Sequence, residues 1–565
     1  MSPTVTAPEA PTEALTRSPE HPGTGASDTT RERLLMGDEA AARGALDAGI
    51  SAAYAYPGTP ATEAFEAILS HSERTGRPAA AWSVNEKTAY EQALGVSMAG
   101  RRSLVVMKHV GLNVAADPFM NSALVAIHGG LVAVVADDPG MHSSQNEQDS
   151  RFYAGFARTL CLEPADHQQA YEMTREAFEL SERFGIPVLL RLVTRLAHSR
   201  SAVTTRPGKP ERPVAKTTER DAWILLPANA RGLWRRLVEV QRQLREWSES
   251  CAYNRLAWSD DDRGLGVVTT GVAQGYYRQN LPALGFTPTH LHVGAYPLPV
   301  AKLRRLAQRV ERILVLEEGY PYLEERLRGI LPTPVEVRGQ LSGHLPETGE
   351  LTPDTVGHAL GLPRRAGVAL AGEPLPRRPP QLCQGCPHRD TFAALVAALR
   401  DHPGAIVNAD IGCYTLGALP PYSAIESCVC MGAGVGMAKG ASDAGLRPAV
   451  AVIGDSTFLH SGITPLIDAV QADTDMTLII LDNAAVGMTG AQDTVLPSTR
   501  LEPLVLGLGV DPEHCRVLDA HPRRVPEMTE ALEQELAHRG LSVVIAVREC
   551  IEHARLRKRR ARRGR

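Results

Sequence analysis

The chain has 565 residues, 43% of them hydrophobic, which is too many for one hydrophobic core and predicts three or four domains. Its formal net charge of −4 creates no overall field that favours nucleic acid or a membrane surface. No apolar run approaches the roughly 20 residues that span a bilayer. Residues 1–33 are rich in Pro, Thr, Ala and Glu and lack the apolar segment of a secretory signal. We therefore expect a cytoplasmic protein with a disordered tail over residues 1–33.

The first folded block is expected over residues 34–205. Short runs rich in Val, Leu and Ala alternate there with stretches of helical periodicity, and these runs are residues 52–56, 103–107, 131–136 and 188–192. Strands and helices that alternate at this spacing predict a parallel sheet with helices on both faces.

Residues 206–263 are expected to form a linker and a connecting helix with one apolar face. That face comprises Leu233, Leu237, Val240, Leu244 and Trp247, and it is best explained by packing on a neighbour. A second α/β block follows over residues 264–361. Its expected strands are residues 265–270, 291–294, 313–316 and 335–338.

A third block is expected over residues 381–554, after a Pro- and Arg-rich linker at 362–380. Its clearest strands are residues 449–453, 477–481 and 542–547. Residues 555–565 carry a run of Arg and Lys, which we expect to be a solvated tail or to touch an acidic partner rather than to bind nucleic acid. The predicted fold class is α/β, with several doubly wound parallel-sheet domains.

Two strands of the third block end in polar residues. One ends in Gly454-Asp455-Ser456, and the next ends in Asp482-Asn483. The carboxyl ends of parallel strands line the ligand crevice of such a sheet, and one carboxylate, one amide oxygen and a backbone carbonyl suit Mg²⁺ with phosphate oxygens. The alternative is that Asp-Asn is only a turn after a core strand. The pair resembles the thiamine-diphosphate motif, and this resemblance implies Asp455, Asn483 and the carbonyl of Ala485 as Mg²⁺ ligands.

Thiamine chemistry also needs a carboxylate that contacts the aminopyrimidine ring nitrogen of the cofactor, because that contact favours the tautomer that removes the C2 proton. Glu86 is the candidate in the first block, since it stands where a predicted strand turns into a helix. Glu63 and Glu91 are alternatives.

Several longer strings resemble the large subunit of indolepyruvate ferredoxin oxidoreductase, a thiamine-diphosphate-dependent 2-oxo acid oxidoreductase family. The resemblance covers about residues 34 to 552, in the family's order. The strings lie at residues 35–40, 56–63, 82–87, 107–118, 135–149, 383–389, 410–417, 430–433 and 488–492. The resemblance implies a pyrimidine-binding domain at 34–205, a transketolase-C-like domain at 264–361 and a diphosphate-binding domain at 381–554.

The same resemblance assigns roles to individual residues. Glu86 becomes the catalytic glutamate, and Thr59 becomes a contact of the substrate carboxylate. Lys108 and His142 are weaker candidates for the wall of that pocket, as is Asn113. The implied cofactor-binding residues are Gly454, Asp455, Ser456, Asn483, Gly58, Asn113, His388, Cys430, Met488 and Thr489.

Seven of the nine cysteines follow residue 380, and this uneven distribution indicates a metal or redox site in the C-terminal block. Cys383 and Cys386 form C-x-x-C, Cys413 follows a predicted strand, and Cys550 ends the last one. The resemblance implies that these four hold a [4Fe–4S] cluster, whereas a zinc site fits the same residue types. We expect Cys428 and Cys430 to be small buried residues beside the cofactor loop, and Cys161, Cys251 and Cys515 to be structural thiols.

The chain departs from the family pattern at several points. Cys550 is the last cysteine, so the family's two-cluster ferredoxin-like domain is not found and electrons are expected to leave directly to a partner. Ser456 and Ala491 stand where the family usually has Gly. No segment matches the small second (beta) subunit, which we expect as a separate chain.

The sequence thus predicts oxidative decarboxylation of a 2-oxo acid, an arylpyruvate such as indolepyruvate, to an acyl-coenzyme A. Electrons would pass through the cluster to ferredoxin or another acceptor. We expect an oligomer, either a heterotetramer or a homodimer of the large subunit. A non-oxidative thiamine-dependent decarboxylase or lyase is the alternative. A non-catalytic assembly subunit is disfavoured by the presence of Glu86, Asp455 and Asn483.

Overall fold

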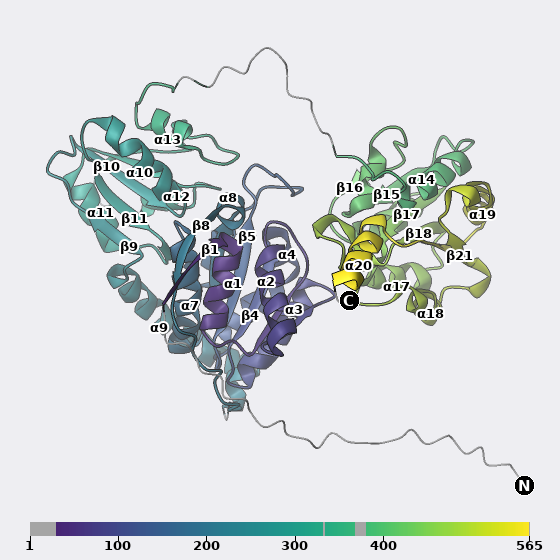
Figure 1. Ribbon diagram of the computed structural model, residues 1–565, viewed down its shortest axis with the longest axis horizontal. Helices are drawn as coiled ribbons and strands as arrows, with labels where there is room; N and C mark the ends of the chain where they lie inside the picture. The colour runs from purple at the N-terminus through teal and green to yellow at the C-terminus, as the bar shows by residue number, and fades with distance from the viewer. Residues whose placement is uncertain (1–29, 218, 332–333, 366, 368–379, 564–565) are drawn as a thin grey trace, which may run out of the picture.

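The computed structural model describes residues 30–217, 219–331, 334–365, 367 and 380–563. Three α/β units follow one another, each built on a largely parallel sheet (Figure 1). Within the described residues no helix is both long and apolar enough to cross a membrane.

The first unit contains a seven-stranded sheet of order β12-β6-β7-β5-β4-β2-β3. All neighbouring strands are parallel except β12, which pairs antiparallel with β6. The central strands β5 and β7 are buried throughout, which explains why they stand out in the sequence as continuous apolar runs. The strands are β2 (Ala52–Ala55), β3 (Ala79–Trp82), β4 (Ser103–Lys108), β5 (Leu131–Asp137), β6 (Leu160–Leu162), β7 (Val188–Val193) and β12 (Ala295–Tyr296).

Helices cover both faces of this sheet, as predicted. On one face lie α1 (Gly37–Asp47), α2 (Thr62–Thr75) and α7 (His167–Phe184), and on the other lie α3 (Glu86–Met98), α4 (His109–Val114) and α5 (Ala116–Leu124). The predicted boundary of the N-terminal tail was wrong. Strand β1 (Arg31–Met36) already pairs antiparallel with β8 (Arg200–Thr205), because the two ends of the unit close against each other. Residues 1–29 of the predicted tail lie outside the described residues.

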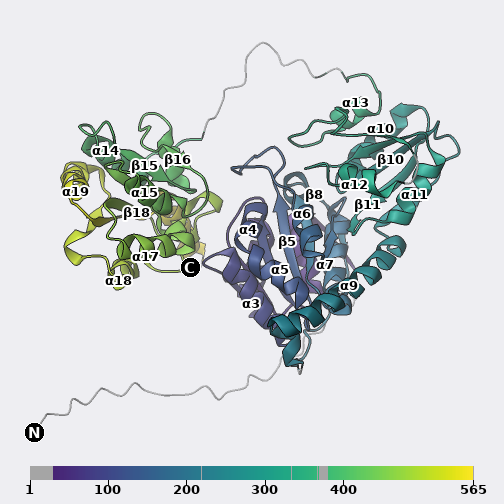
Figure 2. The ribbon, with the colours of Figure 1, turned by 180° about the vertical axis from the view of Figure 1, so that it is seen from behind.

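The second unit contains a five-stranded sheet of order β14-β13-β10-β11-β9. Its strands are β9 (Asn254–Ala257), β10 (Leu265–Thr270), β11 (Thr289–Val293), β13 (Arg312–Leu316) and β14 (Glu336–Arg338). The predicted start at 264 was too late, because β9 joins the edge of this sheet antiparallel to β11. The preceding helix α9 (Pro227–Ser250) buries the predicted apolar face from Leu233 to Trp247, and Figure 2 shows it along the outside of the first unit.

The third unit contains six parallel strands in the order β16-β15-β17-β18-β22-β21. They are β15 (Ile406–Ala409), β16 (Ser427–Cys428), β17 (Ala449–Gly454), β18 (Met476–Asp482), β21 (Cys515–Asp519) and β22 (Leu541–Val547). The predicted basic tail from 555 continues the helix α20 (Ile551–Arg563), and most of its described side chains are exposed. Of the predicted linker 362–380, residues 366 and 368–379 lie outside the described residues.

The third unit packs against the first unit near α3 and α4, on the side away from the second unit (Figures 1 and 2). Side-chain hydrogen bonds cross this interface. The Tyr56 hydroxyl lies 2.9 Å from Ser456 Oγ, and the Gln492 amide donates to Glu66 at 2.8 Å. The ends of β2 and β4 therefore face the ends of β17 and β18, which places the predicted site residues of both units around one space.

Candidate active site

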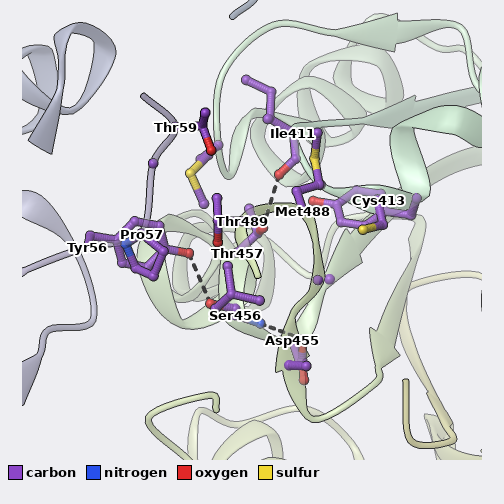
Figure 3. A pocket seen from close by; sticks show the side chains of 18 of the residues that line it. Tyr56, Pro57, Thr59, Ile411, Cys413, Asp455, Ser456, Thr457, Met488 and Thr489 are labelled. Atoms are coloured by element: carbon purple, nitrogen blue, oxygen red, sulfur yellow. Dashed lines mark hydrogen bonds between the residues drawn. The ribbon is translucent and has the colours of Figure 1, made fainter. Parts of the chain in front are cut away.

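A cavity with about 910 Å³ of empty space, part of it open to solvent, lies between the first and third units. Its walls combine the segment after β2, the start of α3 and the end of β4 with the segments after β15, β17 and β18. Figure 3 shows side chains from the segments after β2, β15, β17 and β18. Of the predicted site residues, those that line it are Gly58, Thr59, Glu86, Lys108, His388, Cys413, Gly454, Asp455, Ser456, Asn483, Ala485, Met488 and Thr489.

Two predicted cofactor contacts do not reach this cavity. The exposed Asn113 amide accepts a hydrogen bond from the Tyr153 hydroxyl at 2.6 Å. Cys430 is exposed, and the cavity is lined by its neighbour Met431 instead. In both cases the predicted motif lies beside the site, but another side chain of the same segment, Val110 or Met431, faces the cavity.

Two buried carboxyl groups meet where β17 and β18 end. Asp455 and Asp482 each leave their Oδ2 atom buried without a hydrogen-bond partner. Burial, together with the neighbouring Asp482, raises the pKa of Asp455 well above its usual range. Carboxyl groups at this depth either keep a proton or are neutralised by a cation, and oxygen ligands of this kind suit a hard divalent cation. The residues therefore fit a Mg²⁺–diphosphate site, and sequence reasoning did not single out Asp482, whose buried carboxyl group lies beside that of Asp455.

The turn after β18 is organised around Asn483. Its Oδ1 accepts from the amide of Ala485 at 3.0 Å, and its Nδ2 lies 3.1 Å from Nε2 of His388. Burial lowers the pKa of His388 to about 4, so the neutral ring accepts this hydrogen bond. Ala484, between Asn483 and Ala485, adopts φ +58°, and its amide donates to Asp482 Oδ1 at 3.2 Å.

Gly454 is required by the ring of Tyr414, because a Cβ at position 454 would lie 2.7 Å from Tyr414 Cε1. The Tyr414 hydroxyl donates to the buried Asp410, whose pKa is raised to about 7 by burial. Asp410 in turn accepts from the amide of Gly432 at 3.0 Å. This internal network shapes the floor below the strand ends, and nothing in the sequence pattern pointed to Tyr414.

Glu86 begins α3, as the strand-to-helix pattern predicted. Asn85 caps the helix by accepting from the amide of Thr88 at 2.8 Å, and the Glu86 side chain is only 6% exposed. Its Oε2 lies 2.8 Å from Nε2 of His460 in the third unit. A buried carboxylate at the junction of the two units is where a cofactor ring held by the third unit would be contacted.

The alternative glutamates occupy other surroundings. Glu63 lies beside Asp38 and pairs with His198 at 3.4 Å, and Glu91 pairs with Lys87 on an exposed helix face. Neither lines the cavity.

Lys108 and Thr59 form the wall opposite the strand ends of the third unit. The Lys108 Nζ donates to the carbonyl of Ser143 at 3.1 Å, and Ser143 Oγ donates to the carbonyl of Thr59 at 3.2 Å. Burial lowers the pKa of Lys108 to about 8, so its ammonium is retained near neutrality. The third candidate for this wall, His142, is exposed and pairs with Glu350 instead.

Cys383, Cys386, Cys413 and Cys550 converge at one side of the cavity. Burial raises the pKa of Cys413 to about 12, and the thiols of Cys386, Cys550 and Cys383 add to this shift. Arg548 links two of the segments that carry them, since it donates to the carbonyl of Gly385 at 3.4 Å. Cys413 also lines the cavity.

The four thiols fit both kinds of metal site that the sequence allows, a zinc ion and an iron–sulfur cluster.

The other cysteines are separate from this group. Cys428 and Cys430 are exposed, so the prediction that they are buried was wrong, because β16 lies at the edge of its sheet. Cys161 is buried and Cys251 and Cys515 are half-buried.

Comparison with known proteins agrees with this arrangement. Residues 43–228 match the family "Pyruvate flavodoxin/ferredoxin oxidoreductase, thiamine diP-bdg", and residues 410–546 match "Thiamine pyrophosphate enzyme, C-terminal TPP binding domain". The chain is 38% identical to indolepyruvate oxidoreductase subunit IorA of Archaeoglobus fulgidus, over 92% of this chain and 86% of that protein. The chain belongs to the IorA family.

A second IorA protein, from Methanothermobacter thermautotrophicus, is 37% identical over 92% of this chain and 87% of its own length. Among solved structures, a 2-oxoglutarate:ferredoxin oxidoreductase from Magnetococcus marinus matches with a TM-score of 0.49 and 18% identity, over 58% of this chain and 65% of that chain.

Membership of the IorA family and the two thiamine diphosphate domains make this chain a thiamine-diphosphate-dependent 2-oxo acid oxidoreductase. The relatives named here are oxidoreductases, so the alternative of a non-oxidative decarboxylase has no support among them.

Proposed function

We propose that this IorA-family chain oxidises an arylpyruvate, such as indolepyruvate, to the corresponding acyl-coenzyme A and CO₂. The balanced reaction is 2-oxo acid plus coenzyme A giving acyl-coenzyme A, CO₂, one proton and two electrons. The observation that carries the proposal is the single cavity that Glu86, the Asp455–Asn483 strand ends and Cys413 all line. The aryl side chain is proposed because both named relatives are indolepyruvate oxidoreductases.

Each wall of the cavity has a role in this proposal. Asp455, Asn483 and the carbonyl of Ala485 hold Mg²⁺ with the diphosphate, and the unpaired oxygens of Asp455 and Asp482 support this assignment. Bound thiamine diphosphate supplies the electron sink for decarboxylation. Glu86 holds and exchanges the proton of the aminopyrimidine ring. The Lys108 ammonium and the Thr59 hydroxyl bind the carboxylate of the 2-oxo acid.

Cys383, Cys386, Cys413 and Cys550 would hold a [4Fe–4S] cluster, which would supply one-electron transfer away from the cavity. The position of Cys413 supports this assignment. Its thiol lines the cavity and lies close to Gly487, since a Cβ built at Gly487 would be 2.9 Å from Cys413 Sγ. The acceptor in the proposal is ferredoxin or a similar carrier, and a small second subunit completes an oligomeric enzyme. A cytoplasmic location is part of the proposal, and the free cysteines support it because thiols stay reduced there.

The proposal is tested by anaerobic purification with iron, sulfide, magnesium and thiamine analysis, with the partner subunit co-expressed. A panel of aryl and aliphatic 2-oxo acids is then assayed with and without coenzyme A and with a dye acceptor. We expect coenzyme A-dependent dye reduction that is fastest with arylpyruvates. Release of an aldehyde without dye reduction would replace the proposal with a non-oxidative decarboxylase, and preference for an aliphatic acid would overturn the substrate assignment alone.

A further inference from the structure

The carboxylate of Glu86 is held by a residue from the opposite unit. His460 lies in the π-helical turn Phe458–Gly462, which follows the Gly-Asp-Ser segment at the end of β17. Its Nε2 is 2.8 Å from Glu86 Oε2, and the two side chains are only 1% and 6% exposed. This is therefore a buried contact between groups 374 positions apart in the sequence.

Three further contacts hold His460 in this position, two of them to the ring. The Ser461 Oγ lies 2.6 Å from Nδ1, and the ring of Tyr56 meets the imidazole edge-on with centroids 4.7 Å apart. The carbonyl of His460 accepts from Asn85 Nδ2 at 3.0 Å. Since Asn85 also caps α3, the start of that helix and the turn that carries His460 form one docked unit.

These contacts assign the hydrogen positions on the ring. An ionised carboxylate only accepts hydrogen bonds, so Nε2 carries the hydrogen that is donated to Glu86. In the neutral ring Nδ1 then accepts, and the Ser461 hydroxyl donates to it. The result is a hydrogen-bonded chain Ser461–His460–Glu86, in which the Ser461 hydroxyl fixes the tautomer of the ring.

The other side of the carboxylate is closed by α4. A Cβ at Gly111 would lie 2.5 Å from Glu86 Oε1, so the backbone of α4 leaves no room for a side chain there. His460 does not line the cavity, whereas Glu86 does. His460 therefore acts on the cavity through the lining residues that it contacts, Glu86 and Tyr56, and only Glu86 is held by a hydrogen bond from its ring.

We propose that His460 is the positioning residue of the catalytic glutamate. Its Nε2 hydrogen holds Oε2 of Glu86 and thereby fixes the orientation that the carboxylate presents to the aminopyrimidine ring. Because His460 belongs to the diphosphate-binding unit, the glutamate is aligned only when the two units are docked. This inference rests on the proposed role of Glu86 in the proposed function.

The test compares three substitutions of His460 in the complete enzyme. The amide nitrogen of Gln occupies the place of Nε2, whereas that of Asn occupies the place of Nδ1. We expect His460→Ala and His460→Asn to lower kcat about 10- to 100-fold, the usual cost of losing an orienting partner, and His460→Gln to recover most of it. The KM for the 2-oxo acid and the Kd of thiamine diphosphate, measured by calorimetry on apoprotein with Mg²⁺, should stay within about threefold. His402→Gln, on an exposed position of the same unit, is the control.

A double-mutant cycle shows whether His460 acts through Glu86. We expect Glu86→Gln/His460→Ala to be no slower than Glu86→Gln alone, because the group that His460 positions is already lost. Gly111→Ala provides a second variant that leaves His460 intact, and it should lower kcat with little change in the melting temperature of the apoprotein.

Several results would overturn this inference. Wild-type kcat in His460→Ala, equal activity of the Asn and Gln variants, or additive losses in the cycle would each remove the positioning role. Recovery of His460→Ala by added imidazole, with His460→Gln still slow, would replace positioning with proton transfer. If Glu86→Gln itself turns over normally, the proposed function of Glu86 fails. If Glu86→Gln is inactive and His460→Ala is not, only the present inference fails.

Discussion

Asp455 and Asp482 stand at the ends of the paired strands β17 and β18, and each buries one carboxylate oxygen that makes no hydrogen bond. In the apoprotein burial, together with the neighbouring Asp482, raises the pKa of Asp455. A carboxyl group whose pKa is raised by folding stabilises the native state below its unfolded pKa of about 4, and this contribution is lost as the pH rises through the folded value. The pair therefore costs stability at neutral pH until a cation neutralises it.

This relationship predicts opposite effects of Asp455→Asn on stability and on cofactor binding. At neutral pH the metal-free variant should melt above the wild type, and its melting temperature should fall less as the pH rises from about 4. Mg²⁺-dependent binding of thiamine diphosphate should be lost. Scanning calorimetry with chelator, and titration calorimetry with Mg²⁺, measure the two effects. A less stable variant that still binds the cofactor would contradict the assignment.

Glu86→Gln should preserve the fold and thiamine diphosphate affinity and lower kcat by about 10²- to 10⁴-fold, since an amide cannot exchange the proton of the aminopyrimidine ring. Glu91→Gln, on the exposed face of the same helix, is the matched control and should be unchanged. Steady-state rates with the dye acceptor give kcat for both variants and the wild type. Normal turnover of Glu86→Gln would move the role to another carboxylate.

Lys108→Gln should raise the KM for the 2-oxo acid about 10- to 100-fold, the effect of losing one charge-assisted hydrogen bond. The pKa of Lys108 is lowered to about 8, so the wild-type KM should rise above that pH as the ammonium loses its proton. In the variant this part of the pH profile should be flat. Lys87→Gln, on the surface of α3, serves as the control, and a KM insensitive to Lys108 would leave Thr59 as the carboxylate contact.

Four single substitutions to Ser should each abolish the iron–sulfur cluster, at Cys383, Cys386, Cys413 and Cys550. The reason is that a hydroxyl is a poor ligand for iron in such a cluster. The same change at the exposed Cys430 should leave four irons per chain. Iron content and the paramagnetic spectrum of the reduced enzyme provide the measurement. Zinc in place of iron, or loss of the cluster in the Cys430 variant, would contradict the ligand set.

Much of the fold and part of the site could be predicted because their signals are local. Buried parallel strands such as β5 and β18 appear as uninterrupted apolar runs, and the polar residues that follow a strand mark its end. Glu86 could be placed at a helix start because a predicted strand turns into a helix at that point, and the structure shows that Asn85 caps this helix. Short edge strands such as β1 and β9 were missed, since their pairing depends on partners far along the chain.

The amino-acid sequence by itself therefore determined which segments become strands and helices and which polar residues stand at the strand ends. Only the tertiary structure decided which of these residues meet. The contact of Glu86 with His460, the unpaired oxygens of Asp455 and Asp482, and the lowered pKa of Lys108 all arise when distant segments exclude water from one another. Desolvation and charge proximity depend on the packed arrangement of the chain, and a local pattern of residues does not contain that information.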